Sequence, residues 1–307
     1  MRLDPNPIVG GPTVVRRPIV VGVDDSPASH CALDWAVDEA TSRQAPLDVV
    51  YAWRSMYTTW PDGPSLADLA VASRDYGEGR LASLVTRAQT AAPHASISGD
   101  LLEGRPSAVL LEAAAAAQAQ MLVIGARGVG GFDGLLLGSV ALHVVTNAPC
   151  PVVVVRVAPR PDGPIVVGND GSPESEAVLS AAFDEASVRN AELDVVRVLY
   201  VHSEAEGVPN QDAALASATC EASESMERLL ADAAHNYPDV KVRAELPVGY
   251  PAEILINASS QASMLVMGSR GGGGFADMGL GSVAHAVVHH SHCPVMLLRR
   301  RTISDHA

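Results

Sequence analysis

The chain has 307 residues, which is long for one domain and suits two domains of about 150 residues each. Its formal net charge of −14 argues against nucleic acid and against an anionic membrane surface as partners, because both attract basic proteins. Apolar residues make up 48% of the chain and aromatic residues only 4%. We therefore expect a core of aliphatic side chains, as in a buried parallel sheet covered by helices.

The first half alternates aliphatic runs with stretches of helical character. The run Pro18–Asp24 is followed by Ser26 and Pro27, and a serine N-cap followed by proline is a strong helix start. The longest helix is predicted at about 65–92. In chain order, strands are predicted at 18–24, 47–51, about 96–102, 121–124 and 152–156.

The second half repeats this order of elements. Its first run, Pro164–Asp170, is again followed by Ser172 and Pro173, and its long helix is predicted at about 210–236. Further strands are predicted at 193–198, about 240–246, 264–267 and 295–299. The repeat indicates a duplicated domain.

Strands that alternate with helices predict an α/β fold built from right-handed crossovers and parallel sheets. We expect two tandem doubly wound domains, each a five-stranded parallel sheet of order 3-2-1-4-5 with helices on both faces. The first domain is expected at 1–157, with its core from about residue 17. The second is expected at 164–301, after a turn-forming linker at 158–163.

A glycine-rich loop recurs after the fourth strand of each half. The first copy reads Gly125-Ala-Arg-Gly128, then nine residues, then Gly138-Ser139. The second reads Gly268-Ser-Arg-Gly271, then nine residues, then Gly281-Ser282. A single loop of this kind often serves only as a turn between a strand and a helix. Two copies with the same spacing and flanks favour a binding function.

The loop chemistry suits phosphate. Glycines let successive backbone N–H groups converge on an anion, and the helix that follows adds its positive N-terminal end. Arg127 and Arg270 are expected to add positive charge over the phosphates. The loop is not a Walker A motif, because the only lysine of the chain is Lys241.

The strand that ends in Val-Asp-x-Ser, the Gly-x2-Gly-x9-Gly-Ser loop and the closing Cys-Pro-Val strand resemble the universal stress protein family, in its ATP-binding branch. The resemblance covers nearly the full length of both halves. It implies one ATP site per domain, with Mg²⁺, and a role in stress-responsive regulation. The binding residues that it implies are Gly22, Asp24, Gly125, Ala126, Arg127, Gly128, Val129, Gly130, Gly131, Gly138 and Ser139 in the first half, and Gly168, Asp170, Gly268, Ser269, Arg270, Gly271, Gly272, Gly273, Gly274, Gly281, Ser282 and Val283 in the second.

Asp24 and Asp170 need a separate explanation, because a carboxylate repels a phosphate. Each is expected to accept a hydrogen bond from the ribose or to share Mg²⁺ with the phosphates, and the alternative is an interaction with the first helix dipole. The second strands lead into different residues, Ala52-Trp-Arg54 in the first half and Leu199-Tyr-Val201 in the second. We therefore expect unequal affinities at the two sites.

The expected function is nucleotide-dependent regulation, and the alternative is a slow ATPase or phosphotransferase that uses the same sites. No catalytic base occurs at matched positions of both halves, and the histidines 289, 290 and 292 have no counterparts that would support a metal site. The four cysteines and the lack of a long apolar stretch lead us to expect a cytoplasmic protein without membrane contact. Partners are expected to be ATP, a second copy of the tandem chain and an unknown protein.

Replacement of Gly125 by alanine or of Gly128 by glutamate is expected to weaken ATP binding in the first half and to leave the fold intact, because the loop binds through its backbone. The measurement is the ATP affinity of a chain whose second site is disabled. An unchanged affinity would remove the assignment of the glycine loop.

Overall fold

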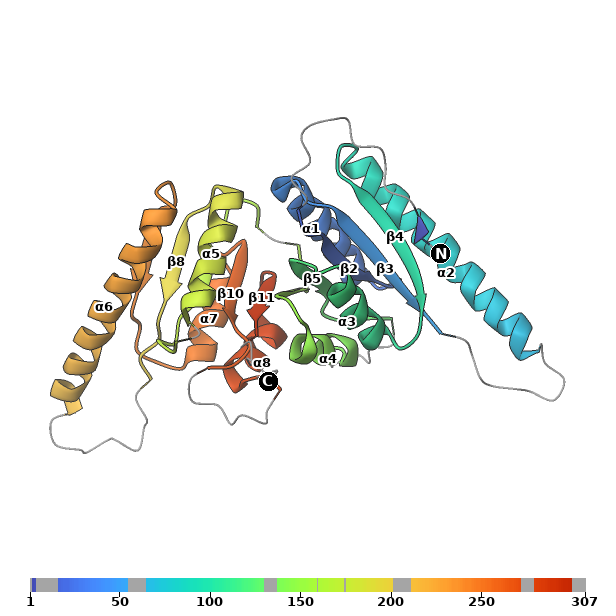
Figure 1. Cartoon of the computed structure of the whole chain (residues 1–307). Coiled ribbons are helices and arrows are strands. Elements are labelled where there is room, and N and C mark those ends of the chain that lie inside the picture. The colour runs from blue at the N-terminus through green and yellow to red at the C-terminus, as the bar shows by residue number, and fades with distance from the viewer. Residues whose placement is uncertain are drawn as a thin grey trace, which may run out of the picture. The chain divides into compact units, whose positions relative to one another are not determined.

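A computed structural model of the chain describes residues 2–3, 16–54, 65–129, 137–158, 160–173, 175–200, 211–271 and 279–299. The chain divides into two compact units, Met1–Ala158 and Pro159–Ala307. Each unit is an α/β structure and is described by itself (Figure 1).

Unit 1 contains a parallel sheet with an added edge strand. Its strands are β1 (Arg2–Leu3), β2 (Ile19–Val23), β3 (Leu47–Trp53), β4 (Ile97–Glu103), β5 (Met121–Gly125) and β6 (Val152–Val155). Its helices are α1 (Pro27–Arg43), α2 (Leu66–Ala91), α3 (Pro106–Ala116) and α4 (Ser139–Asn147). The short strand β1, which the sequence analysis did not predict, pairs antiparallel with β4.

The strands of unit 1 follow the order β4-β3-β2-β5-β6, and all four pairs are parallel. Helices α1 and α2 contact each other on one face of the sheet, and α3 and α4 contact each other on the opposite face (Figure 1). The chain therefore changes its direction of travel between β2 and β5, as in doubly wound folds. This arrangement confirms the predicted order 3-2-1-4-5 for the first half.

Unit 2 repeats the arrangement. Its strands are β7 (Ile165–Gly168), β8 (Leu193–Val196), β9 (Val242–Glu245), β10 (Met264–Gly268) and β11 (Val295–Leu298), in the order β9-β8-β7-β10-β11. Its helices are α5 (Ser175–Arg189), α6 (Gln211–Asn236), α7 (Pro251–Ser259) and α8 (Ser282–His290). All four strand pairs are parallel, so the predicted fold class is confirmed for the second half as well.

The central strands are buried on both faces, which explains their uninterrupted aliphatic sequences. All five residues of β2 are buried, and so are the first four residues of β5. Helix α1 begins where the sequence predicts, because Ser26 lies in the extended region and its hydroxyl accepts from the backbone N–H of Ser29 at 3.1 Å. The proline at the first helical position has no N–H that needs a partner there.

One buried ion pair recurs in the first helix of each unit. Glu39 in α1 is about 1% exposed and pairs with Arg43 one turn later. In α5 the equivalent Glu185 pairs with Arg189 at 3.4 Å. A buried carboxylate needs such a partner, so the pair accounts for the Asp-Glu-Ala sequence that both helices share.

Within the described ranges, no helix is both long and apolar enough to cross a membrane.

The fold predicts a large stability cost for truncation in β5. Leu122 is fully buried at the centre of the sheet of unit 1, so Leu122→Ala should lower the free energy of unfolding by about 2–5 kcal/mol. Leu142→Ala is the matched control, because Leu142 is 42% exposed and its loss should cost less than about 0.5 kcal/mol. All three tryptophans precede residue 61, so tryptophan fluorescence during urea unfolding reports on unit 1. Equal midpoints for the two variants would contradict the packing described here.

Candidate nucleotide site

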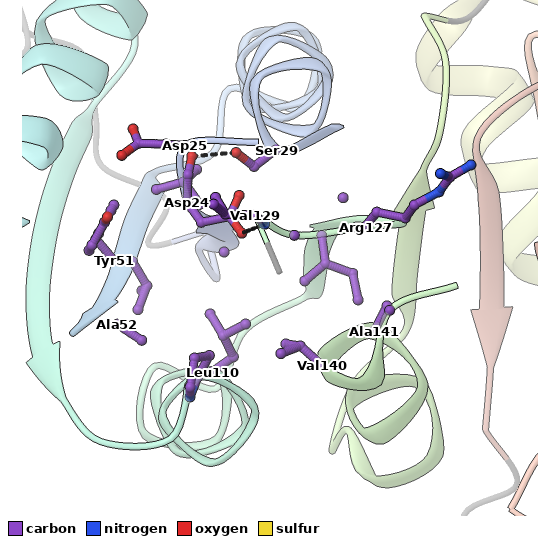
Figure 2. Close-up of a pocket in the computed structure, with 18 of the residues that line it drawn as sticks. Asp24, Asp25, Ser29, Tyr51, Ala52, Leu110, Arg127, Val129, Val140 and Ala141 are labelled. Atoms are coloured by element: carbon purple, nitrogen blue, oxygen red, sulfur yellow. Dashed lines mark hydrogen bonds between the residues drawn. The ribbon is translucent and has the colours of Figure 1, made fainter. Parts of the chain in front are cut away.

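A cavity of about 660 Å³ opens at the carboxyl ends of β2, β3 and β5 in unit 1 (Figure 2). This is the point where the strand order changes direction, and doubly wound sheets bind their ligands there. The volume lies within the usual range of small-molecule sites. Tyr51 and Ala52 lie at one end of the cavity, and Val140 and Ala141 of α4 lie at the other.

The structure brings most of the residues predicted for the first site together around this cavity. The predicted residues that line it are Gly22, Asp24, Gly125, Ala126, Arg127, Gly128, Val129, Gly138 and Ser139. Gly130 and Gly131 lie outside the described residues.

The carboxylate of Asp24 lies against the glycine loop. Its Oδ2 accepts a hydrogen bond from the backbone N–H of Val129 at 3.1 Å (Figure 2). Its Oδ1 accepts from the N–H of Ser26 at 2.9 Å. The N–H of Val129 therefore points into the cavity and already binds one anionic group, the carboxylate of Asp24.

One serine joins the loop after β2 to the glycine loop, and a second joins the same loop to the start of α1. The hydroxyl of Ser26 donates to the carbonyl of Arg127 at 2.9 Å, and the hydroxyl of Ser29 donates to the carbonyl of Asp24 at 2.5 Å. Because the first bond joins loops that are separated by three crossovers along the chain, it ties the two sides of the cavity together.

Two positions of the loop require glycine, because neighbouring atoms lie too close to leave space for a side chain. A Cβ on Gly128 would lie 2.5 Å from Asp24 Oδ2, so a side chain there would displace the carboxylate. A Cβ on Gly125 would lie 2.7 Å from the backbone carbon of Ala28 in α1. Backbone cannot move aside as a side chain can. The expectation that Gly125→Ala leaves the fold intact is therefore wrong.

The N-terminus of α4 forms one wall of the cavity. Its N-cap is Gly138, which provides no side chain to bond the first N–H groups of the helix. By contrast, α1 and α2 each begin with a serine whose hydroxyl accepts such a bond. The first turn of an α-helix leaves N–H groups without intrahelical partners, and here Gly138 and Ser139 line the cavity. This end of the cavity is suited to an anion.

The side chain of Arg127 points away from the cavity (Figure 2). Its backbone lines the cavity, and its carbonyl is held by Ser26. The expected charge of Arg127 over the phosphates is therefore not provided by this conformation. Its contribution to the site here is made by the backbone.

A polar cluster that was not predicted from the sequence lies at the opposite end of the cavity. The carboxylate of Asp25 accepts from the hydroxyl of Tyr76 at 2.7 Å and from the guanidinium of Arg80 at 2.5 Å, both in α2. Asp25, Tyr51 and Tyr76 line the cavity. The cluster attaches α2 to the loop after β2.

The ionisation of this cluster follows from its contacts. Partial burial acts to raise the pKa of Asp25, but the hydrogen bonds of Tyr76 and Arg80 and the charge of Arg80 outweigh it and hold that pKa below its ordinary value. Burial, followed by the negative charge of Asp25, raises the pKa of Tyr51 to about 12. Near neutral pH this end of the cavity therefore presents a carboxylate beside a neutral phenol.

Unit 2 has the same frame around Asp170. Its Oδ1 accepts from the N–H of Ser172 at 3.0 Å and from the hydroxyls of Ser172 and Ser175, each at 2.6 Å. A Cβ on Gly271 would lie 3.0 Å from Asp170 Oδ2, as on Gly128 in unit 1. Helix α8 also begins at a glycine N-cap, Gly281.

The remaining residues predicted for the second site belong to the same elements. Gly168 and Gly268 end β7 and β10, Ser269 and Arg270 follow β10, and Ser282 and Val283 begin α8. Gly272, Gly273 and Gly274 lie outside the described residues. The hydroxyl of Ser269 and the amide nitrogen of Asn169 are buried without a hydrogen-bond partner among the described residues.

The strand register corrects one comparison of the two halves. Gly22 pairs with Val50 and Gly168 pairs with Val196, so Tyr51 corresponds to Arg197 and Trp53 to Leu199. The sequence analysis compared Ala52 with Leu199, which is wrong by one position. In the correct alignment the two strands share the sequence Leu-Asp-Val-Val and then differ, with Tyr51 in unit 1 and Arg197 in unit 2.

Comparison with known proteins identifies the family. The sequence profile described as "Universal stress protein family" matches residues 16–156 and 163–299. The chain belongs to this family. A curated universal stress protein of Mycobacterium tuberculosis is 36% identical over 290 residues, which cover 92% of this chain and 97% of that protein.

A solved structure that spans both units has the same fold. A universal stress protein of Archaeoglobus fulgidus matches 92% of this chain and 96% of its own, with a TM-score of 0.65 and 18% identity. A universal stress protein solved in complex with cAMP matches 46% of this chain and 98% of its own, with a TM-score of 0.35 and 27% identity.

The Asp25–Arg80 pair predicts a pH-dependent contribution to stability. Because the pKa of Asp25 is lower in the folded state, the stabilisation is full above the ordinary carboxyl pKa of 3.8 and is lost as the pH falls through the lowered value. A double-mutant cycle with Asp25→Asn and Arg80→Gln, analysed by urea unfolding, should show coupling at about pH 6 and none at about pH 2. The same coupling at both pH values would show that charge is not the source of the interaction.

Proposed function

We propose that this universal stress protein binds ATP, with Mg²⁺, at one site in each unit, and that nucleotide occupancy regulates its activity in a stress response. The observation that carries the proposal is the cavity of unit 1, which extends from an uncapped helix N-terminus and glycine loop to the ends of β2 and β3. The two ends of the cavity differ in chemistry as the two ends of a nucleotide do.

The phosphate end of the proposed site is formed by backbone groups. The N–H of Val129 and the N-terminus of α4 line the same cavity, and the lack of a side chain at Gly128 lets the Asp24 carboxylate lie against the loop. Backbone donors and a helix dipole favour a phosphate without any lysine. The described residues of the predicted first site all lie at this end of the cavity, with Asp24 and Gly22 beside the glycine loop.

The nucleoside end of the proposed site is largely apolar. Ala52 and Leu110 line it together with the ring of Tyr51 (Figure 2), and Val50 precedes Tyr51 in the lining of the cavity. A purine has two apolar faces and polar edges, so it is suited to a space with aliphatic walls and a few polar groups. Asp25 and Tyr76 are placed to hydrogen-bond with a ribose hydroxyl.

Mg²⁺ is part of the proposal because the cavity contains two carboxylates. ATP and Asp24 repel each other unless a cation lies between them. Mg²⁺ in proteins is commonly held by one or two carboxylates together with substrate phosphates, and Asp24 at the glycine loop fits that role. When bound, the ion would supply positive charge between Asp24 and the phosphates.

The proposal extends to ATP binding in unit 2, because the backbone around Asp170 resembles that around Asp24. Asp170, Gly271 and the start of α8 repeat the phosphate end of unit 1. The buried hydroxyl of Ser269 occupies the position of the cavity-lining Ala126 and is available to donate to a phosphate oxygen.

We propose binding rather than turnover as the function of both sites. The cytoplasmic location and the pairing of two chains expected from the sequence belong to the same proposal.

The proposal predicts that Gly128→Ala weakens Mg-ATP binding in unit 1. The added Cβ would push the Asp24 carboxylate into the phosphate position, so we expect a loss of at least about tenfold in affinity, or about 1.4 kcal/mol. Isothermal titration of the full chain measures the affinity and the number of sites. The equivalent Gly271→Ala should weaken the second site and leave the first unchanged.

Gly79→Ala is the matched control, because Gly79 lies in α2 and a Cβ there would meet nothing within 4 Å. It should leave ATP binding unchanged while making the helix slightly more stable. Absence of ATP binding by the wild-type chain in the presence of Mg²⁺ would overturn the proposed function. Release of phosphate during the titration would favour the alternative of a slow ATPase.

A further inference from the structure

The two units differ at the nucleoside end of the proposed sites. In unit 1 this end contains the Asp25 carboxylate, which Tyr76 and Arg80 hold in place. Asp25 follows Asp24 directly, and in unit 2 the residue that follows Asp170 is Gly171. The carboxylate of unit 1 therefore has no counterpart in unit 2.

The partners of Asp25 are replaced as well. Helices α2 and α6 both have 26 residues, and the buried positions Gly77 and Leu81 of α2 correspond to Ala222 and Met226 of α6. Tyr76 and Arg80 then correspond to Glu221 and Ser225. None of the interactions that attach α2 to the loop after β2 is possible with these residues.

Arg197 takes the place of Tyr51 and makes the contact to the long helix instead. Its guanidinium donates to the carbonyl of Ala222 at 3.5 Å. The same guanidinium packs on the backbone of Gly171, where a Cβ would lie 2.5 Å from its nearest nitrogen. Gly171 has a φ of +75°, a conformation that glycine adopts without strain. The loop after β7 is thus shaped to leave room for the guanidinium.

Among the described residues, no carboxylate lies within ion-pair distance of Arg197. Its side chain is half-buried, and within the part of the chain that the structure describes it forms no ion pair. Asp170 lies in the loop after β7, Glu221 in α6 and Glu245 on the adjacent strand β9, but none forms an ion pair with it within 4 Å. A partly buried guanidinium without a counter-charge costs free energy, which an anion placed against it would recover.

On the basis of the proposed function, we propose that the site of unit 2 takes a nucleotide with a second anionic group at its nucleoside end, such as a phosphate on the ribose 2′ or 3′ oxygen, in addition to its 5′ phosphates. Arg197 pairs with that group. Unit 1 rejects the same ligand, because the Asp25 carboxylate would lie against the added phosphate. The two sites of one chain therefore bind different classes of nucleotide.

The test compares AMP with adenosine 3′,5′-bisphosphate, which differ only in the 3′-phosphate. Both are titrated into the full chain carrying Gly128→Ala, so that unit 2 dominates the signal, and Mg-ATP is titrated in parallel. We expect the 3′-phosphate to strengthen binding by about tenfold or more. Arg197→Gln should remove this gain and leave the affinity for AMP nearly unchanged, and Arg197→Lys should retain part of it.

Arg228→Gln is the matched control for the loss of a positive charge, since Arg228 lies on the exposed face of α6. It should preserve the gain from the 3′-phosphate. Circular dichroism and the Mg-ATP titration show whether Arg197→Gln has kept the fold of unit 2.

The outcomes separate the two proposals. If Mg-ATP binds to unit 2 and the 3′-phosphate adds nothing, the inference about Arg197 is overturned while the proposed function stands. If Arg197→Gln weakens AMP and the bisphosphate equally, the guanidinium acts on the base or the 5′-phosphate, and the inference is again overturned. If no nucleotide binds to the wild-type chain, both proposals fail.

Discussion

The adjacency of β2 and β5 is the constraint on which the candidate site depends. Parallel strands that are neighbours end at the same edge of the sheet, so the loop after β2 and the loop after β5 must share the same space. That space is filled on one side by the Asp24 carboxylate. Only a residue without a side chain fits opposite it, which is why Gly128 is a glycine. The bond from Ser26 to the carbonyl of Arg127 then sets the width of the cavity.

This adjacency also explains why a carboxylate belongs in a site proposed for phosphate. The N–H groups of the glycine loop are directed toward the cavity, and in the structure Asp24 satisfies the one from Val129. A phosphate that enters the cavity competes with Asp24 for the same donor. The competition is resolved if a cation draws both anions to itself, which converts a repulsive pair into a shared ligand set. Occupancy of the site and the position of the loop after β2 are then linked, as regulation by nucleotide requires.

The sequence predicted the fold because duplication doubled each weak signal. One Gly-rich turn or one Ser-Pro helix start is common, but the same series in both halves predicted the strand order and brought attention to the glycine loop that is proposed to bind phosphate. The nucleoside end was not predictable in the same way. Asp25 meets Tyr76 and Arg80 only through the packing of α2 on the sheet, and no sequence spacing encodes that contact. The direction of the Arg127 side chain likewise depends on three-dimensional packing (Figure 2).

The features that the repeats share and those that they do not share have different physical origins. Binding through backbone N–H groups depends on glycines, helix starts and strand order, so both units keep them while most other loop residues vary. Recognition at the opposite end depends on side chains, and there Tyr51 and Asp25 are replaced by Arg197 and Gly171. A duplicated chain can change its side chains at one site without disturbing the backbone that is proposed to hold the phosphates. Divergence in ligand is therefore expected at the nucleoside end first, because that end of the site is decided by a few side chains rather than by the fold.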